Sequence, residues 1–167
     1  MRALSELEKV NTEFLDKMGV QYVLICLTQN ILRHGIFDAT VALRNLLKEK
    51  SVHNYSNQSP GDKISILTHI LTFKKDIKTN SSMYKAGTRG DARMWFGSEI
   101  YKVAKPDDIF AVIPKDGTIY VLPITHLDIE YCCATSINNP IKHFFAETII
   151  DDIAFSFDLA CIFSAKS

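Results

Sequence analysis

Residues 84–95 carry the residue types that are best suited to holding a phosphate chain. Three cations, Lys85, Arg89 and Arg93, share this stretch with two glycines and two aromatic residues, Tyr84 and Trp95. Arginine binds anions through a two-pronged fork, glycine lets the backbone approach a ligand, and aromatic rings stack on bases. The spacing fits neither a dinucleotide fingerprint nor a P-loop. The segment predicts nucleic-acid-binding residues at Lys85, Arg89, Arg93 and Trp95. The alternative is a solvated loop with Trp95 in the core.

Residues 27–50 form a second candidate for nucleic-acid binding. The pattern predicts two helices joined by a short turn that contains Gly35, which is the outline of a helix-turn-helix. Side chains of the second helix suit phosphates and base edges. The residues that this helix would present to DNA are Thr40, Arg44, Asn45 and Lys48. An ordinary pair of antiparallel helices explains the same pattern, so both interpretations stay open.

Residues 107–123 contain the clearest structural signal in the chain. Two apolar, β-rich runs flank the turn Lys115-Asp116-Gly117, and Asp-Gly between such runs is typical of a β-hairpin. The hairpin anchors the fold but does not by itself point to a function.

The wider block 101–124 resembles the group I intron-associated branch of the PD-(D/E)xK nucleases. There, an aromatic and charged patch precedes an Asp-Ile/Tyr-Phe-Ala-Val run, a short turn and a Tyr-Leu-Ile-Pro run. The matching residues here are Asp108-Ile109-Phe110-Ala111-Val112 and Tyr120-Val121-Leu122-Pro123. The resemblance implies a restriction-endonuclease-like fold from about Asp38 onward, whereas residues 1–35 have no counterpart.

The same resemblance implies Mg²⁺-dependent cleavage of phosphodiesters. In those enzymes an acidic residue, and a Glu or Gln two positions before a Lys, converge on Mg²⁺ and the attacking water. By position, the family pattern maps Asp62 as a metal ligand and Lys74 as the residue that assists the water. Glu49, late in the third predicted helix, is the candidate for the remaining acidic metal ligand. Thr72 departs from the pattern, because a neutral hydroxyl is a poor ligand for Mg²⁺. The site is therefore expected to be either active or degenerate.

Composition limits the classes of protein to which this chain can belong. A length of 167 residues suits one domain covering 1–167, and 19 basic residues balance 19 acidic ones, so no global field attracts a polyanion. The four cysteines and five histidines lack the spacing of a zinc site. The longest apolar run, 20–27, is too short to cross a bilayer, and the first eight residues do not resemble a signal peptide. These features predict a cytoplasmic protein with no membrane partner.

The expected elements give an α+β (or α/β) fold. Residues 1–50 predict three helices: the first starts at a capping box formed by Ser5 and Glu8, the second covers 20–31, and the third is capped by Asp38. The β-branched content of 20–31 leaves a buried strand as an alternative. Residues 51–63 read as a polar linker without core residues.

The part from 64 to 167 is expected to hold a mixed, mainly antiparallel sheet around the central hairpin, followed by a C-terminal helix and strand. Asn139-Pro140 predicts the start of the helix. The expected segments are a strand at 64–73, a mobile loop at 79–91, a strand or short helix at 94–103 and a strand at 153–163.

Two functional classes follow from the sequence. The first is a nucleic-acid-binding protein of restriction-endonuclease-like fold that acts on DNA or RNA. The second is a non-enzymatic protein-binding module, such as an immunity protein, an inhibitor or an accessory subunit. The neutral net charge and the lack of a complete catalytic motif favour the second class.

Overall fold

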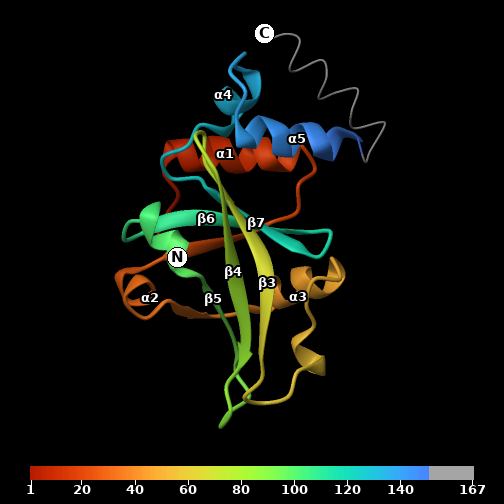
Figure 1. Ribbon diagram of the computed structural model, residues 1–167. Helices are drawn as coiled ribbons and strands as arrows, with labels where there is room; N and C mark the ends of the chain where they lie inside the picture. The colour runs from red at the N-terminus through yellow and green to blue at the C-terminus, as the bar shows by residue number, and fades with distance from the viewer. Residues whose placement is uncertain (151–167) are drawn as a thin grey trace.

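Seven strands form one curled, mixed sheet in the computed structural model, which describes residues 1–150 (Figure 1). The strand order is β1-β6-β7-β3-β4-β5-β2, and every neighbouring pair is antiparallel except β3 and β7. The strands are β1 (Val23–Leu27), β2 (Ile36–Asp38), β3 (Lys63–Leu71), β4 (Asp76–Lys85), β5 (Ala92–Phe96), β6 (Asp108–Lys115) and β7 (Thr118–Pro123). The helices are α1 (Glu6–Lys17), α2 (Gln29–His34), α3 (Val41–Glu49), α4 (Ile129–Ala134) and α5 (Pro140–Ile150), with short 3-10 helices η1 (Tyr55–Asn57) and η2 (Ser98–Lys102). The α+β prediction is confirmed.

The central hairpin is the best-predicted element of the fold. β6 and β7 pair from Phe110↔Pro123 to Lys115↔Thr118, and the two residues between them have positive φ angles of 52° at Asp116 and 74° at Gly117. A two-residue turn with both central φ angles positive matches the twist of the strands, and Asp-Gly adopts it readily.

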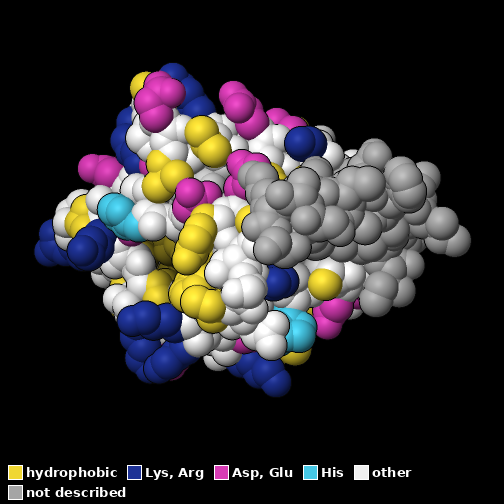
Figure 2. All heavy atoms as spheres, turned by 90° about the horizontal axis from the view of Figure 1, so that it is seen from above, with side chains coloured by type: hydrophobic (Ala, Val, Ile, Leu, Met, Phe, Trp, Pro, Cys, Tyr) yellow, Lys and Arg dark blue, Asp and Glu magenta, His cyan; other side chains and the backbone are white. Residues whose placement is uncertain are grey.

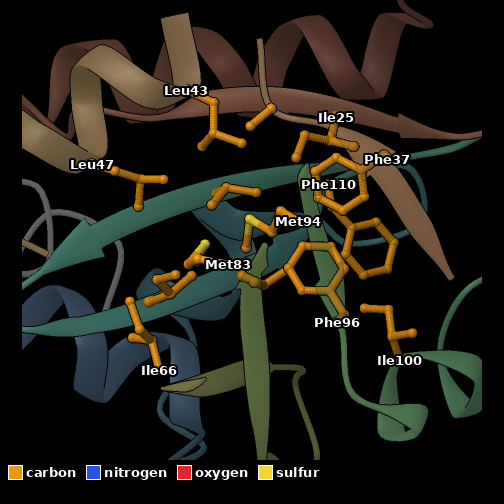
Figure 3. Packing of buried hydrophobic residues seen from close by; sticks show 14 of the residues in the cluster. Ile25, Phe37, Leu43, Leu47, Ile66, Met83, Met94, Phe96, Ile100 and Phe110 are labelled. Carbon is orange, nitrogen blue, oxygen red and sulfur yellow. The ribbon is translucent and has the colours of Figure 1, made fainter. Parts of the chain in front are cut away.

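The inner face of the curled sheet encloses the first hydrophobic core. Leu43 and Leu47 of α3 pack onto this face and are almost fully buried. Figure 3 shows these two side chains pointing toward Met83 and Met94 of the sheet. α3 is amphipathic, so its opposite side is left to polar residues and lies toward solvent.

The second hydrophobic core lies on the outer face of β1, β6 and β7, under α1, α4 and α5 (top of Figure 1). Its largest members include Phe14 and Leu15 of α1 and Phe145 of α5. β6 contributes to both cores, which explains why seven of its eight residues are buried. Within residues 1–150, no helix is long and apolar enough to span a membrane.

The outer face of β3, β4 and β5 beyond these helices is not covered by any described element. Lys63, Leu67 and Asn80 on this face are exposed. The prediction of a mobile loop at 79–91 was wrong, because residues 76–85 form β4 and only residues 86–91 make a turn. The polar composition of β4 made it look like a loop, because one face of this strand is polar and meets solvent. On its other face the buried Ser81 forms a hydrogen bond with Thr68 at 2.6 Å.

The helical prediction for residues 20–31 was also wrong. The chain forms β1, the six-residue α2 and then β2, because β1 finds a partner in β6 and β2 finds one in β5. The strand alternative was the correct one for 23–27. The helix-turn-helix interpretation does not hold, because β2 separates α2 from α3. Thr40 rather than Asp38 caps α3, by accepting a hydrogen bond from the backbone of Leu43 at 3.2 Å.

The polar segment 51–63 is not a linker without core residues. Tyr55 is 6% exposed, and its hydroxyl donates to the backbone oxygen of Arg93 at 2.9 Å. His53 and Gln58 are buried and bond each other at 2.9 Å. One aromatic side chain and a few internal hydrogen bonds therefore attach this segment to the sheet.

The C-terminal helix α5 begins at Pro140 as expected, and Asn139 accepts a hydrogen bond from the backbone of Lys142 at 2.9 Å. A helix α4 that the sequence did not suggest precedes it. The strand expected at 153–163 lies outside the described residues.

An ion pair between the partly exposed Arg2 and the buried Glu8 ties the start of the chain to the sheet, and its removal should be measurable as a loss of stability. Glu8 has a side chain that is 0% exposed and accepts hydrogen bonds from Arg2, from the backbone of Ser5 at 2.7 Å and from Thr125 at 2.8 Å. The Arg2 guanidinium is the main reason why the pKa of Glu8 is lowered to about 2. Substituting Arg2→Ala should lower the free energy of unfolding at neutral pH, because the buried carboxylate of Glu8 loses its counter-charge.

The stabilising effect of Glu8 should depend on pH in a defined direction. A carboxyl whose folded pKa lies below its ordinary value of 4.5 stabilises the fold above that value and loses its contribution as the pH falls toward 2. Urea unfolding should therefore show a difference in the free energy of unfolding between the natural protein and Arg2→Ala, and this difference should become smaller as the pH falls. Lys9→Ala is the control, since Lys9 pairs at 3.3 Å with the exposed Glu6. A difference in the free energy of unfolding that stays constant with pH would contradict the role given to Glu8.

Candidate functional site

A hollow of about 650 Å³ lies between α3, the segment around η1 and the turn that joins β4 to β5. Its lining comes from three separate stretches of the chain. The first supplies Asp38, Ala39, Arg44, Asn45 and Lys48; the second, Asn54, Tyr55 and Ser56; and the third, Lys85, Arg89, Gly90, Asp91, Ala92 and Arg93. We call this site the basic hollow.

Cations outnumber carboxylates in the basic hollow. Five of its residues are lysine or arginine, whereas only Asp38 and Asp91 are acidic. Arg44 and Lys48 are four residues apart on α3, so they lie on the same side of that helix. The net positive charge is local, since the whole chain is formally neutral.

Arg93 is held loosely by the two acidic residues. Its Nε lies 3.8 Å from Asp38 and one of its terminal nitrogens lies 3.8 Å from Asp91. These distances are too long for hydrogen bonds. The Nε atom of Arg93 is buried and donates no hydrogen bond to any described residue. Because a buried donor without a partner is costly, this arginine would gain from an additional acceptor.

Two of the cations also support the walls of the hollow. Lys85 donates to the backbone oxygens of Tyr55 and Gln58 at 3.3 and 3.1 Å, which fixes η1 against β4. Arg44 donates to the backbone oxygen of Ala39 at 3.1 Å and keeps its other donors available. Within residues 1–150, the side chains of Lys48 and Arg89 make no hydrogen bond or ion pair, and both are free to meet a ligand.

The turn that carries Arg89 is well defined. The backbone of Ala86 bonds Asp91 at 2.9 Å, and Gly90 bonds Ala86 at 2.8 Å. Gly90 has a φ of +72°, a conformation that a side chain would strain. The buried phenol of Tyr55 forms part of the floor, and burial raises the pKa of Tyr55, so this group stays neutral beside an anion.

The structure brings together most of the residues predicted to bind nucleic acid. Arg44, Lys85, Arg89 and Arg93 all line the basic hollow. Trp95 does not line it and is not in the core; it lies half-buried on the outer face of β5, near Tyr84. No local pattern connects residue 44 with residues 85–93, because the contact depends on the pairing of Asp38 in β2 with Arg93 in β5.

The structure does not bring together the three residues expected to hold Mg²⁺ and assist its water. Asp62 precedes β3 and Lys74 follows it, so the strand alone separates them by about 25 Å. Lys74 lies in the β3–β4 turn, beside the helices at the top of Figure 1. Glu49 is exposed at the end of α3, where it lines a different hollow together with Asp16 and Gln21. The prediction that Asp62, Glu49 and Lys74 form one metal site therefore disagrees with the positions of these residues in the fold.

The helical end that carries Lys74 lies at the other end of β3 and β4 from the basic hollow. Figure 2 views this end of the molecule and shows basic, acidic and hydrophobic side chains interspersed. Lys74 and Lys75 are both exposed there, which makes them suitable control positions for any test of the basic hollow.

Sequence reasoning missed the part of the site that comes from 51–63. Asn54 accepts a hydrogen bond from the backbone of Ser56 at 3.0 Å, and this local turn presents Asn54, Tyr55 and Ser56 to the hollow. A lone aromatic residue inside a polar run is the signal that could have identified it, since Asn-initiated turns are common in such runs.

Comparisons with known proteins do not assign this chain to a family. No family model matches the chain, and neither the curated proteins nor the solved structures contain a match. The resemblance of residues 101–124 to the intron-associated nucleases stays an expectation from the sequence.

Proposed function

We propose that this chain binds nucleic acid through the sugar–phosphate backbone at the basic hollow. One observation carries the proposal. Two stretches far apart in the sequence, each suited to phosphates by residue type, meet in a single hollow with five cations and two carboxylates. Lysine and arginine supply most of the affinity of proteins for nucleic-acid backbones.

The chemistry of the lining favours a polyanion over a small buried ligand. Sites for small molecules are mostly apolar with a few polar groups. In the basic hollow only Tyr55 and two alanines, Ala39 and Ala92, are apolar. A solvated phosphate chain needs charge and hydrogen-bond donors more than it needs apolar burial.

The proposal extends to binding and not to cleavage. The residues that the nuclease resemblance assigns to catalysis do not share one site, since the expected metal ligand Asp62 and the water-assisting Lys74 lie at opposite ends of β3. We therefore derive no metal-dependent step from this structure.

Neutralising two cations of the hollow should weaken binding. With labelled oligonucleotides at about 50 mM salt, the double variant Arg44→Gln/Arg89→Gln should bind about tenfold to a hundredfold less tightly, because each substitution removes one phosphate contact. The slope of log affinity against log salt should also become shallower by roughly 1.5. Fluorescence anisotropy measures both quantities.

The matched control is Lys74→Gln/Lys75→Gln, which removes the same charge at the other end of the molecule. It should leave affinity within about twofold, since charges beyond a Debye length are screened. Equal losses in the two double variants would mean that binding does not depend on the basic hollow. No binding of the natural protein to any DNA or RNA at low salt would contradict the proposal and favour the protein-binding module.

A further inference from the structure

The outer face of β3, β4 and β5, which no element within residues 1–150 covers beyond α1, α4 and α5, carries the only tryptophan of the chain beside a tyrosine and a lysine. Strand register places Lys63 opposite Tyr84, Tyr84 opposite Arg93, and Trp95 opposite Ser82. Side chains at directly opposed positions lie on the same face of a sheet. We call the group of Lys63, Tyr84 and Trp95 the aromatic platform.

The rings of the aromatic platform are accessible. Tyr84 and Trp95 are half-buried, and their ring centroids are 5.8 Å apart. The ammonium of Lys63 lies 4.7 Å from the Trp95 centroid and 5.7 Å from that of Tyr84. Lys63 is exposed and flexible, so it can move aside for a flat ligand and then pair with that ligand's charge.

Groups that suit the edges of bases surround the platform. Ser82 is half-buried next to Trp95, and Ser65 and Asn80 are exposed on the same face. Lysine adds positive charge at positions 63 and 78. The two acidic residues at the margins already have basic partners, Asp38 with Arg93 and Asp76 with His69.

The platform is continuous with the basic hollow. Arg93 lines the hollow and also stands directly opposite Tyr84 on β4. Neighbouring strands are about 4.8 Å apart, so Arg93 and Tyr84 are adjacent on this face. One nucleic-acid strand can therefore reach both sites.

We propose that the aromatic platform stacks on unpaired bases, so that the ligand of the basic hollow is single-stranded nucleic acid. This inference rests on the proposed function and specifies its ligand. In a duplex the faces of the bases are covered by their neighbours, and only splayed bases can stack on a protein ring. An aromatic pair next to a basic groove is the combination that binds single strands without sequence preference.

Because Trp95 is the only tryptophan, its intrinsic fluorescence reports on the platform alone. A single-stranded DNA or RNA of about 12 nucleotides should quench it. An abasic strand of the same length carries phosphates without bases, and it should bind the hollow without quenching. Running DNA and RNA strands side by side shows which sugar the protein prefers.

Affinity measurements give the second readout. Trp95→Ala should weaken single-strand binding about tenfold, leave duplex binding within about twofold and leave the salt slope unchanged, because stacking involves no counterion release. Trp95→Phe keeps a ring and should retain most of the affinity. Tyr131→Ala removes an aromatic residue that is 55% exposed on α4 and serves as the matched control. Circular dichroism checks that each variant is folded.

The outcomes separate this inference from the proposed function. Unchanged single-strand affinity in Trp95→Ala, together with a loss in Arg44→Gln/Arg89→Gln, would overturn the platform and leave backbone binding in place. Equal quenching by normal and abasic strands would also overturn it. If no nucleic acid binds at all, both proposals fail.

Discussion

Reversing the charge of Arg44, Lys48 and Arg89 together is expected to weaken nucleic-acid binding about a thousandfold at low salt, since three charge-assisted contacts are lost at about 1.5 kcal/mol each. The three side chains line the basic hollow from α3 and from the β4–β5 turn. Glutamate at these positions also adds repulsion of the phosphates, so the thousandfold figure is a lower bound. Anisotropy titrations with single strands measure the loss.

A control with the same change in net charge makes this test specific. Lys17, Lys74 and Lys75 are exposed residues at the helical end of the molecule. Their replacement by glutamate changes the total charge by the same amount, and we expect a loss of less than about tenfold because the sites are screened from the hollow. A comparable loss in both triple variants would mean that net charge, rather than the arrangement of the hollow, decides binding.

Substituting Asn11→Ala should lower the free energy of unfolding by about 3 kcal/mol, the largest effect expected of a single polar residue here. Asn11 is 0% exposed and bonds three backbone groups beyond β7. It donates to the backbone oxygens of Ile124, at 2.9 Å, and Leu127, and accepts from the backbone of Ile129 at 3.0 Å. Alanine would leave all three groups buried without a partner.

Urea unfolding of Asn11→Ala measures this loss, and Asn57→Ala is the control because Asn57 is exposed. The control should change stability by less than about 0.5 kcal/mol. If Asn11→Ala were equally mild, water would have to enter between α1 and the 124–129 segment and satisfy those groups.

Local signals predicted the parts of this fold that depend on neighbouring residues. The hairpin of β6 and β7 follows from Asp116 and Gly117, whose backbone conformation few other pairs adopt at low cost. The start of α1 follows from the capping box of Ser5 and Glu8, with both of its hydrogen bonds present.

Elements that depend on distant partners could not be predicted in the same way. Residues 23–27 have an apolar pattern that fits a helix or a strand, and pairing with β6 decides in favour of β1. β4 looks like a loop because one side meets solvent and the other buries Ser81 against Thr68. Neither hydroxyl has the apolar character by which buried strands are recognised.

In the candidate site, too, the residue types could be recognised locally, whereas their arrangement depends on distant partners. Residue types alone singled out Arg44, Arg89 and Arg93, since their chemistry does not depend on context. Their meeting in one hollow depends on β2 pairing with β5 across more than fifty residues of chain. The contribution of Tyr55 was hidden for the same reason, because its partner is the backbone of Arg93.

The position of β6 has a consequence for how the molecule melts. Phe110 and Val112 of this strand belong to the core under α3, while Ile109, Ala111 and Ile113 belong to the core under α1, α4 and α5. A strand shared in this way cannot leave one core intact while the other opens, so heat should unfold the described part of the chain in one cooperative transition. A ligand in the basic hollow would thereby raise the melting temperature of helices that it never touches.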